Sequence, residues 1–494
     1  MAENFDKFKI NGGLHMSNAT STSLASTRIK ALLDEGSFVE IGGAITARTT
    51  DFNMQQKETP ADGVITGYGV IDGNLVYVYS QDATVLKGAI GEMHAKKIAN
   101  IYDMAMKMGA PVIGLIDCAG LRLQEATDAL NGFGNMYYKQ AMASGVIPQI
   151  TAIFGQCGGG LAVASAMTDF TFMETKSGKL FLNSPNAIEG NEVSKCDTSS
   201  ATFQSEHSGL VDATGTEGEI LGEIRALVCM LPANNEDDAS YDECLDDLNR
   251  TCEGIETVSG DTALVATLLS DNNIFFETKR EYAKDMVTGF IRLNGMTVGV
   301  VANRSQVYNA EGTVETELDT TLSPAGCKKA ADFVEFCDAF NIPLVSLTNV
   351  TGFKACKCAE KTLARESAKL TYAFANATVP KVNVIIGKAF GSAYITMNSK
   401  SIGADMVYAW PQAEIGMMDA KLAAKIMYAD DDAATIDEKA AEYKELQSSP
   451  LAAARRGYVD TIIEPAETRK YLIGAFEMLF TKREERPAKK HGTI

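Results

Sequence analysis

The sequence predicts an α/β protein made of two copies of one domain. Three observations lead to this prediction: apolar strand-like runs alternate with helical stretches, the same order of segments occurs twice, and each copy holds one strand-to-helix turn rich in small residues. Strands that alternate with helices form βαβ units, so each copy is expected to hold a largely parallel sheet.

The first copy contains three runs that are typical of buried strands. Residues 75–80, 112–117 and 149–154 are short and apolar, and they are rich in β-branched or aromatic side chains. Between the first two runs, residues 90–108 repeat apolar side chains at a helical spacing.

The second copy repeats the first at a nearly constant offset. The offset from Pro111 to Pro343 exceeds the offset from Gly67 to Gly289 by ten positions. Ten extra residues are therefore expected in the second copy, within residues 308–324. The period far exceeds the roughly 20–50 residues of solenoid repeats, so this is a domain duplication.

An acidic segment separates the two copies. Residues 232–257 include the runs 236–238 and 246–247, which consist of carboxylates. Such charge runs are typical of a solvated connection. The predicted domains are 1–250 and 251–494.

Composition and charge exclude several classes of function. The 494 residues carry 45 basic and 64 acidic side chains, a net charge of −19. Nucleic-acid surfaces need an excess of Lys and Arg, so no nucleic-acid partner is expected. The first nine residues lack the apolar core of a signal peptide, and no run of about 18 apolar residues occurs. These features predict a cytoplasmic protein.

Each copy contains one unusual strand-to-helix turn. The first turn (154–161) reads FGQCGGGL, and the second turn (386–394) reads IGKAFGSAY. Glycine permits backbone conformations and close ligand approach that a Cβ atom would block. Two N–H groups that converge at a helix start would form an oxyanion hole. One such turn is also explained by close helix–strand packing, but two at matching positions indicate two holes and two carbonyl-bearing substrates.

Side-chain catalysts are not evident beside these turns. None of the four histidines, His15, His94, His207 and His491, lies in either turn, so a triad around Ser392 would lack its base. The turns match neither the P-loop nor the GxGxxG pattern. Catalysis is therefore expected to depend on backbone donors and on substrate positioning.

No metal site is predicted. Cys356 and Cys358 are the only close cysteine pair, and no histidine stands near them. The three consecutive carboxylates of residues 430–432 cannot all face one ion. The ten scattered cysteines are typical of reduced thiols.

In the two turns and in the segments that flank them, the chain resembles the carboxyltransferase subunits of biotin-dependent acyl-CoA carboxylases and decarboxylases. It resembles most of all the propionyl-CoA carboxylase β and methylmalonyl-CoA decarboxylase α types. The similarity extends from about Arg28 to the end of the chain. It includes DGVITGYG (62–69), GAPVIGL (109–115), ASGVIPQ (143–149), KLTYAFANATVPK (369–381) and YAWPQAEI (408–415). The resemblance implies two duplicated crotonase-like β-β-α spiral domains of the ClpP/crotonase superfamily.

The resemblance also implies a reaction, which is transfer of a carboxyl group between carboxybiotin on a separate carrier protein and a short-chain acyl-CoA such as propionyl- or methylmalonyl-CoA. The amides of Gly159 and Gly160 would hold the thioester enolate oxygen, and those of Ser392 and Ala393 would hold the biotin ureido oxygen. Further substrate contacts would come from Gly120, Arg122, Gly158, Gly391, Tyr394 and Ile395.

The implied partners are other proteins of the same reaction. They are a biotin carboxyl carrier protein, a biotin carboxylase or membrane decarboxylase subunits, and a second copy of the chain in at least a dimer. Residues 105–108 read AMKM, the sequence around the biotinylated lysine of carrier domains. That motif needs a hairpin tip and here lies in a predicted helix, so biotin is expected from another chain.

The chain departs from the family pattern mainly on the biotin side. Relatives usually carry DVPGFLPG where residues 349–356 read NVTGFKAC, and Ser392 replaces the middle glycine of GGA. Two alternatives therefore stay open. One is a biotin-independent crotonase-like hydratase or decarboxylase that uses Glu125 or Glu189 as acid or base. The other is a non-catalytic assembly subunit.

Overall fold

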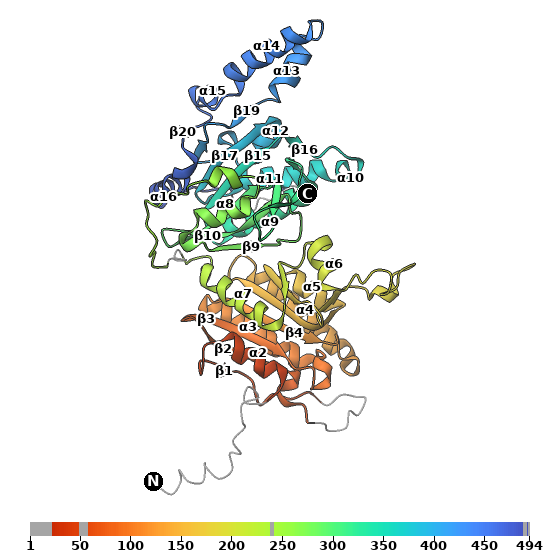
Figure 1. The fold of residues 1–494 in the computed structure, drawn as a ribbon. Coiled ribbons are helices and arrows are strands. Elements are labelled where there is room, and N and C mark those ends of the chain that lie inside the picture. Colours follow the sequence, from red (N-terminus) through yellow and green to blue (C-terminus); the bar gives the residue numbers. More distant parts are fainter. Residues whose placement is uncertain (1–21, 49–57, 238–241, 488–491, 493–494) are drawn as a thin grey trace. The chain divides into compact units, whose positions relative to one another are not determined.

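The computed structural model describes residues 22–48, 58–237, 242–487 and 492. The chain divides into two compact units, Met1–Asp237 and Asp238–Ile494, drawn red to yellow-green and green to blue in Figure 1. The division lies inside the acidic segment 232–257. The end of that segment is not a solvated connection, because Arg250 donates to the carbonyl oxygens of Leu268 and Ser270, and Cys252 is buried.

The first unit is built on one mixed sheet. Its strands in spatial order are β1 (Val39–Glu40), β2 (Val64–Ile71), β3 (Asn74–Gln81), β4 (Val112–Cys118), β5 (Gln149–Gly158), β6 (Phe170–Glu174) and β8 (Ala213–Gly215), and β7 (Lys179–Phe181) pairs with the end of β5. The hairpin β2–β3 is antiparallel, and the pairs from β3 to β8 are parallel, as the alternation of strands and helices predicts.

The second unit repeats this sheet strand for strand. Its order is β9 (Phe275–Thr278), β10 (Met286–Leu293), β11 (Met296–Asn303), β15 (Leu344–Val350), β17 (Lys381–Phe390), β18 (Met406–Ala409) and β20 (Thr461–Ile462), and β19 (Glu414–Gly416) pairs with the end of β17. Even the irregularities match, because the register shifts between Ile116 and Cys118 and again between Thr348 and Val350. The predicted duplication is confirmed.

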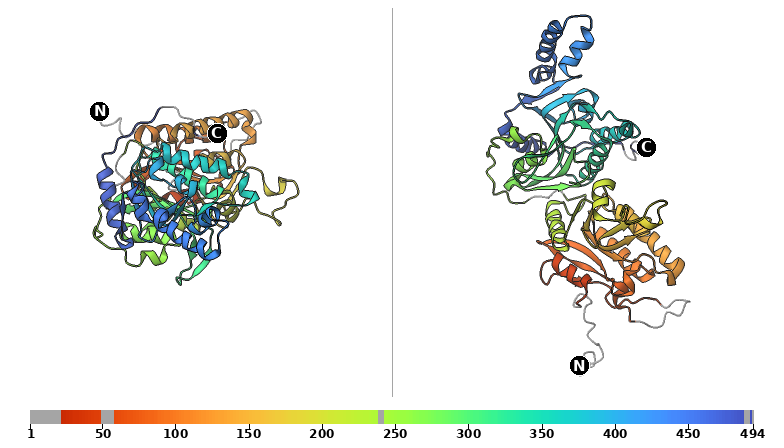
Figure 2. Two further views of the ribbon diagram at one scale, coloured as in Figure 1. Left: turned by 90° about the horizontal axis from the view of Figure 1, so that it is seen from above. Right: turned by 45° about the vertical axis from the view of Figure 1, so that its right-hand side comes forward.

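Helices cover both faces of each sheet (Figure 2). In the first unit, α3 (Glu92–Met108) and α4 (Ala126–Ala143) lie on the face that carries Tyr77 and Ile153, while α2 (Leu24–Leu32) and α7 (Glu217–Met230) cover the other. In the second unit, α9 (Pro324–Ala339) and α11 (Leu363–Asn376) take the place of α3 and α4, and α8 (Thr262–Leu269) and α16 (Thr468–Leu479) take the place of α2 and α7. Burial of these two apolar interfaces is the main source of each unit's stability.

The two units differ in two insertions. Ten residues join β3 to α3 and twenty join β11 to α9, which confirms the predicted ten-residue insertion. The added chain forms a hairpin of β12 (Gln306–Tyr308) and β13 (Val314–Glu317). The second insertion has no sequence signal that predicts it: α13 (Ala420–Met427) and α14 (Ala433–Tyr443) follow β19, lie side by side and extend from the sheet of their unit (Figure 1).

Two further sequence expectations concern helices. Residues 105–108 lie at the C-terminal end of α3, which confirms the predicted helix around AMKM. None of the helices in the described part of the chain combines the length and apolar character that a membrane span needs.

Candidate functional site

The two predicted turns occupy equivalent positions in the duplicated sheets. β5 passes through Gly159 into α5 (Gly160–Ala166), and β17 passes through Gly391 into α12 (Gly391–Thr396). Gly159 and Gly391 stand at the offset that relates the two copies, and both have φ of 61°. Side chains rarely tolerate this left-handed conformation, so a glycine is needed to turn the chain sharply from strand to helix.

In the first turn, the structure differs from the expected pair of donors. The Gly159 N–H donates to the carbonyl oxygen of Phe181 at 2.9 Å, because β7 runs beside the end of β5 and extends its ladder by one bond. Gly159 therefore turns the chain from strand to helix, and its N–H group is not free to bind a ligand. When the two glycine bends are aligned, Ser392 and Ala393 correspond to Gly160 and Leu161. These two residues hold the first N–H groups of α5, which have no partner inside a helix.

Two flanking glycines let the first turn pack closely. A Cβ atom at Gly158 would lie 2.7 Å from the Phe181 ring, and one at Gly160 would lie 2.8 Å from the hydroxyl oxygen of Tyr137. That hydroxyl donates to the carbonyl oxygen of Gly160 at 2.6 Å. The position of the helix start is thus fixed by α4 on one side and β7 on the other.

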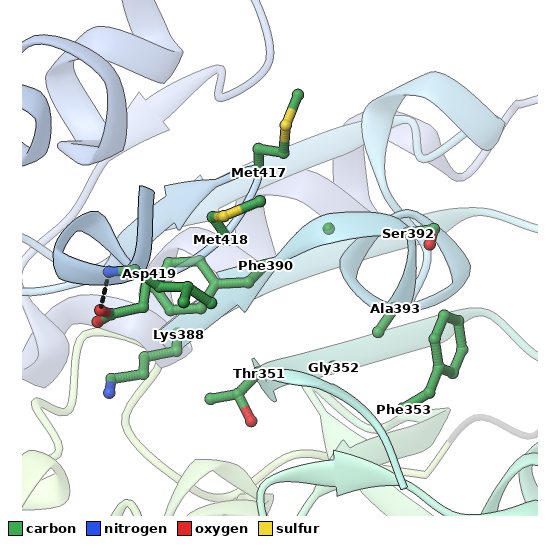
Figure 3. Close-up of a pocket in the computed structure, with 12 residues that line it drawn as sticks. Thr351, Gly352, Phe353, Lys388, Phe390, Ser392, Ala393, Met417, Met418 and Asp419 are labelled. Carbon is green, nitrogen blue, oxygen red and sulfur yellow. Dashed lines mark hydrogen bonds between the residues drawn. The ribbon is translucent and has the colours of Figure 1, made fainter. Parts of the chain in front are cut away.

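The second turn opens into a cavity of about 440 Å³ (Figure 3). Three of its residues, Gly391, Ser392 and Ala393, line that cavity. Together with them it is lined by Thr351, Gly352, Phe353, Lys388, Phe390, Met417, Met418, Asp419 and Leu422. The cavity therefore combines backbone amides, apolar side chains and two charged groups at one site.

Two residues expected to contact substrate lie outside this lining. Tyr394 is buried, and burial raises the pKa of its phenol to about 12. Ile395 is exposed. Since neither lines the cavity, the structure gives no contact between these side chains and a ligand in it.

The segment that departs from the family pattern forms one wall of the cavity. β16 (Gly352–Phe353) pairs with β14 (Thr321–Leu322), and the N–H of Thr351 donates to the carbonyl oxygen of Thr320 at 2.7 Å. These bonds place Thr351 and Phe353 in the lining. The altered sequence therefore retains an ordered wall.

Arg122 lies in a buried ion network. Its Nη1 atom lies 2.7 Å from Asp62 and 2.6 Å from Glu125, and its Nη2 atom donates to the carbonyl oxygen of Ala89. Its side chain is 2% exposed. This geometry gives no support to the expectation that Arg122 contacts substrate, because its guanidinium group pairs with two buried carboxylates. The N–H group of Gly120 also has a partner inside the protein, because it donates to the sulfur of Cys118.

Replacing Arg122 by Met is expected to destabilise the protein by about 3–5 kcal/mol, because two buried carboxylates would lose their cation. Urea denaturation followed by circular dichroism measures the loss. Arg48→Met is the matched control, because Arg48 also pairs with two carboxylates but lies at the surface. An equal loss in both variants would contradict the buried network.

His94 is buried beside this network in a fixed neutral form. The N–H of Asp117 donates to Gln81 Oε1, which leaves the Gln81 amide nitrogen to donate to His94 Nε2. His94 Nδ1 then donates to the carbonyl oxygen of Asp62 at 2.9 Å. Burial lowers the pKa of His94 to about 3, and the nearby Arg122 adds to this effect. A second proton would place an N–H against the Gln81 amide hydrogens.

His94 is expected to make the protein sensitive to acid. An unfolded chain protonates this histidine below about pH 6.5, whereas the folded chain does so only near pH 3. The unfolded state thus binds more protons between these values, and stability falls as the pH is lowered through them. His94→Gln is expected to reduce the stability lost between pH 6.5 and 5 by about 2 kcal/mol, measured by urea denaturation. The same change at the exposed His207 should leave the loss as in the wild type.

Several residues that contact the two turns or line the cavity were not expected from the sequence. Phe181, Tyr137 and Met417 reach the turns only because β7, α4 and β19 pack against them. Lys388 is part of the second turn, and a charged side chain in that turn is a sequence feature that could have marked it as a ligand contact. Within the described residues, no three His, Cys, Asp or Glu side chains form a group suited to a metal ion.

The comparisons with known proteins agree with this architecture. Residues 17–494 match the family model of the carboxyl transferase domain. The chain belongs to the carboxyl transferase domain family. Methylmalonyl-CoA decarboxylase subunit alpha of Propionigenium modestum is 40% identical over 99% of this chain and 97% of its own length. The propionyl-CoA carboxylase beta chain of Roseobacter denitrificans is 43% identical over 95% of this chain and 93% of its own length.

A solved structure gives the same result for the fold. Transcarboxylase 12S, described as a hexamer with hydrolysed methylmalonyl-coenzyme A bound, superposes with a TM-score of 0.89 at 37% identity, over 99% of this chain and 97% of that one. The present chain therefore consists of two duplicated crotonase-like domains. It is an acyl-CoA carboxyltransferase of the propionyl-CoA carboxylase and methylmalonyl-CoA decarboxylase type.

Proposed function

We propose that this carboxyltransferase moves a carboxyl group between biotin on a separate carrier protein and a propionyl- or methylmalonyl-type acyl-CoA. The acyl thioester binds at the first turn and the biotin ureido group binds at the second. One observation carries the proposal: two glycines with the same positive φ precede two helix starts at equivalent positions of a duplicated sheet. One fold thereby presents two sets of amides to two carbonyl groups.

At the first turn, the N–H groups of Gly160 and Leu161 hold the thioester oxygen. Negative charge develops on this oxygen when the acyl α-carbon loses its proton or its carboxylate, and preorganised donors stabilise that charge best. Tyr137 fixes the peptide of Gly160, so the donors need little rearrangement during the reaction. Gly159 acts as the bend, and its own N–H stays on Phe181.

At the second turn, the N–H groups of Ser392 and Ala393 hold the ureido oxygen of biotin. When bound, biotin supplies a ureido nitrogen that carries the carboxyl group and can take the acyl α-proton. The cavity suits such a group, because Phe353, Phe390 and Met418 offer apolar surface next to the amides. A mainly apolar wall with a few convergent polar donors is typical of a small-molecule site.

The partners follow from the same proposal. A biotin carboxyl carrier protein delivers the biotin. A biotin carboxylase would add the carboxyl group to that biotin, or membrane decarboxylase subunits would remove it. We also propose a homo-oligomer, at least a dimer, in which the first turn of one copy works with the second turn of another. The hexameric assembly of transcarboxylase 12S supports this.

The biotin-independent alternative has less support. It needs a carboxylate that is free to exchange a proton with substrate. Glu125 is buried, one of its oxygens pairs with Arg122, and the other accepts the N–H of Glu92 at 2.6 Å. Glu189 lies on the exposed segment between β7 and α6 (Ala201–Phe203). The assembly-subunit alternative predicts no turnover at all.

The proposed function is tested by incubating the protein with methylmalonyl-CoA and biotin. We expect loss of methylmalonyl-CoA and formation of carboxylated biotin in equal amounts, and propionyl-CoA with carboxybiotin should give the reverse. Decarboxylation at the same rate without any biotin compound would support the biotin-independent enzyme instead. Acyl-CoA binding without turnover, also with a biotinylated carrier protein present, would support the assembly subunit.

A further inference from the structure

Among the described residues, Lys388 is the only cationic one in the lining of the second cavity. Its side chain is exposed, and within the same part of the chain no carboxylate oxygen lies within the 4.0 Å of an ion pair with its Nζ atom. In Figure 3, its ammonium group lies toward one end of the lining residues, and Ser392 and Ala393 lie toward the other. One end of the cavity therefore holds the Lys388 ammonium group, with the Asp419 carboxylate at the same end, and the other end holds the amides.

Two carboxylates near Lys388, those of Asp419 and Glu414, bond to other groups. Asp419 accepts the N–H groups of Lys421 and Leu422 at 3.0 and 3.1 Å and so caps α13. Figure 3 draws one of these bonds as a dashed line. Glu414, the partner of Lys388 in the β17–β19 ladder, pairs with Lys444 at 2.8 Å. The positive charge of Lys388 is thus left available to a ligand.

The backbone under Lys388 is fixed by a chain of amide side chains. The N–H of Lys388 donates to Asn349 Oδ1 at 3.0 Å, and the N–H of Asn349 donates to Asn303 Oδ1 at 3.2 Å. Asn349 also fills the space beside Gly387, where a Cβ atom would lie 2.6 Å from its oxygen. The side chain can therefore move only about its own torsions, above a fixed peptide.

The duplication shows that this cation belongs to the second unit alone. The equivalent residue of the first unit is Gln156, which is exposed but neutral. Both positions precede their glycine bend by three residues. The two turns thus share their backbone and differ in the charge of the side chain at this position, which indicates that the ligand of the second turn offers a negative or strongly accepting group to Lys388.

We propose that Lys388 binds the carboxyl or amide carbonyl group at the end of the valeryl side chain of biotin. This inference rests on the proposed function, which puts the ureido ring at Ser392 and Ala393. Biotin is a long molecule whose ureido carbonyl and valeryl carboxyl group lie at opposite ends. With the ring at the amide end of the cavity, the valeryl group reaches toward the end that holds Lys388. Free biotin presents a carboxylate to Lys388, and carrier-bound biotin presents the carbonyl oxygen of an amide.

The two forms of biotin give a sharp test. Lys388→Met is expected to raise the KM for free biotin about fivefold, because a partly exposed ion pair is lost. The KM for biocytin, the amide of biotin with lysine, should rise about twofold or less, because a hydrogen bond to a neutral acceptor is the weaker contact. The KM for methylmalonyl-CoA should not change. Calorimetric titration of each biotin compound measures the same difference in binding without turnover.

Two matched variants complete the experiment. Lys388→Arg keeps the cation and should retain the preference of the wild type, and Lys425→Met removes an exposed lysine of α13 that does not line the cavity. Equal effects of Lys388→Met on both biotin compounds, or an effect on methylmalonyl-CoA alone, would overturn the inference while leaving the proposed function intact. Absence of transfer to any biotin compound in the wild type would overturn both.

Discussion

Replacing Ser392 by proline is expected to lower kcat for carboxyl transfer by about 10²–10³-fold, the cost of losing one donor from an oxyanion hole. Proline has no N–H, so the variant removes the donor itself. Ser392 stands in the first turn of α12, where an N–H makes no intrahelical bond and proline is tolerated. Its side chain is exposed, so a ring fits there.

Ser392→Ala separates the amide from the hydroxyl. It keeps the backbone donor, and its kcat should stay within about threefold of the wild type, because a solvent-exposed hydroxyl contributes little. The assay follows methylmalonyl-CoA loss with saturating biotin, and unchanged affinity for methylmalonyl-CoA shows that the first site is intact. Equal losses in both variants would mean that the hydroxyl, and not the amide, does the chemistry.

The sequence alone predicts the fold to a large extent because its signals are local or periodic. The constant offset that relates Pro111 to Pro343 needs no structure to be seen, and it correctly predicts equivalent strands and equivalent turns. The ten-residue insertion also follows from counting, and the structure builds it as the β12–β13 hairpin.

The parts that the sequence does not reveal depend on distant partners. The sequence does not reveal which glycine N–H groups of the first turn are free to bind a ligand. Only the pairing of β7 with β5 shows that the Gly159 N–H donates to the carbonyl oxygen of Phe181. Arg122 lies in a family motif and was therefore expected at the substrate. Its burial against Asp62 requires that the start of β2 and the chain after β4 meet, and no local pattern predicts this contact.

Replacing Gly160 by proline is expected to lower kcat by about 10²–10³-fold as well, through loss of a donor to the thioester oxygen. Gly159 is unsuitable for this test, because its φ of 61° is closed to proline and its N–H serves the ladder. Gly160 is the first residue of α5, where proline fits the helix.

The proline needs a background that accepts its Cβ atom. Any Cβ at position 160 would lie 2.8 Å from the hydroxyl oxygen of Tyr137, so Tyr137→Phe, which removes that oxygen, should carry both test variants. The Gly160→Ala form in this background keeps the N–H, and its kcat is the reference for the Gly160→Pro form. Each is assayed for methylmalonyl-CoA loss with biotin present. If the two forms turned over equally, the first turn would not stabilise the enolate, and the thioester oxygen would have to be held by other donors.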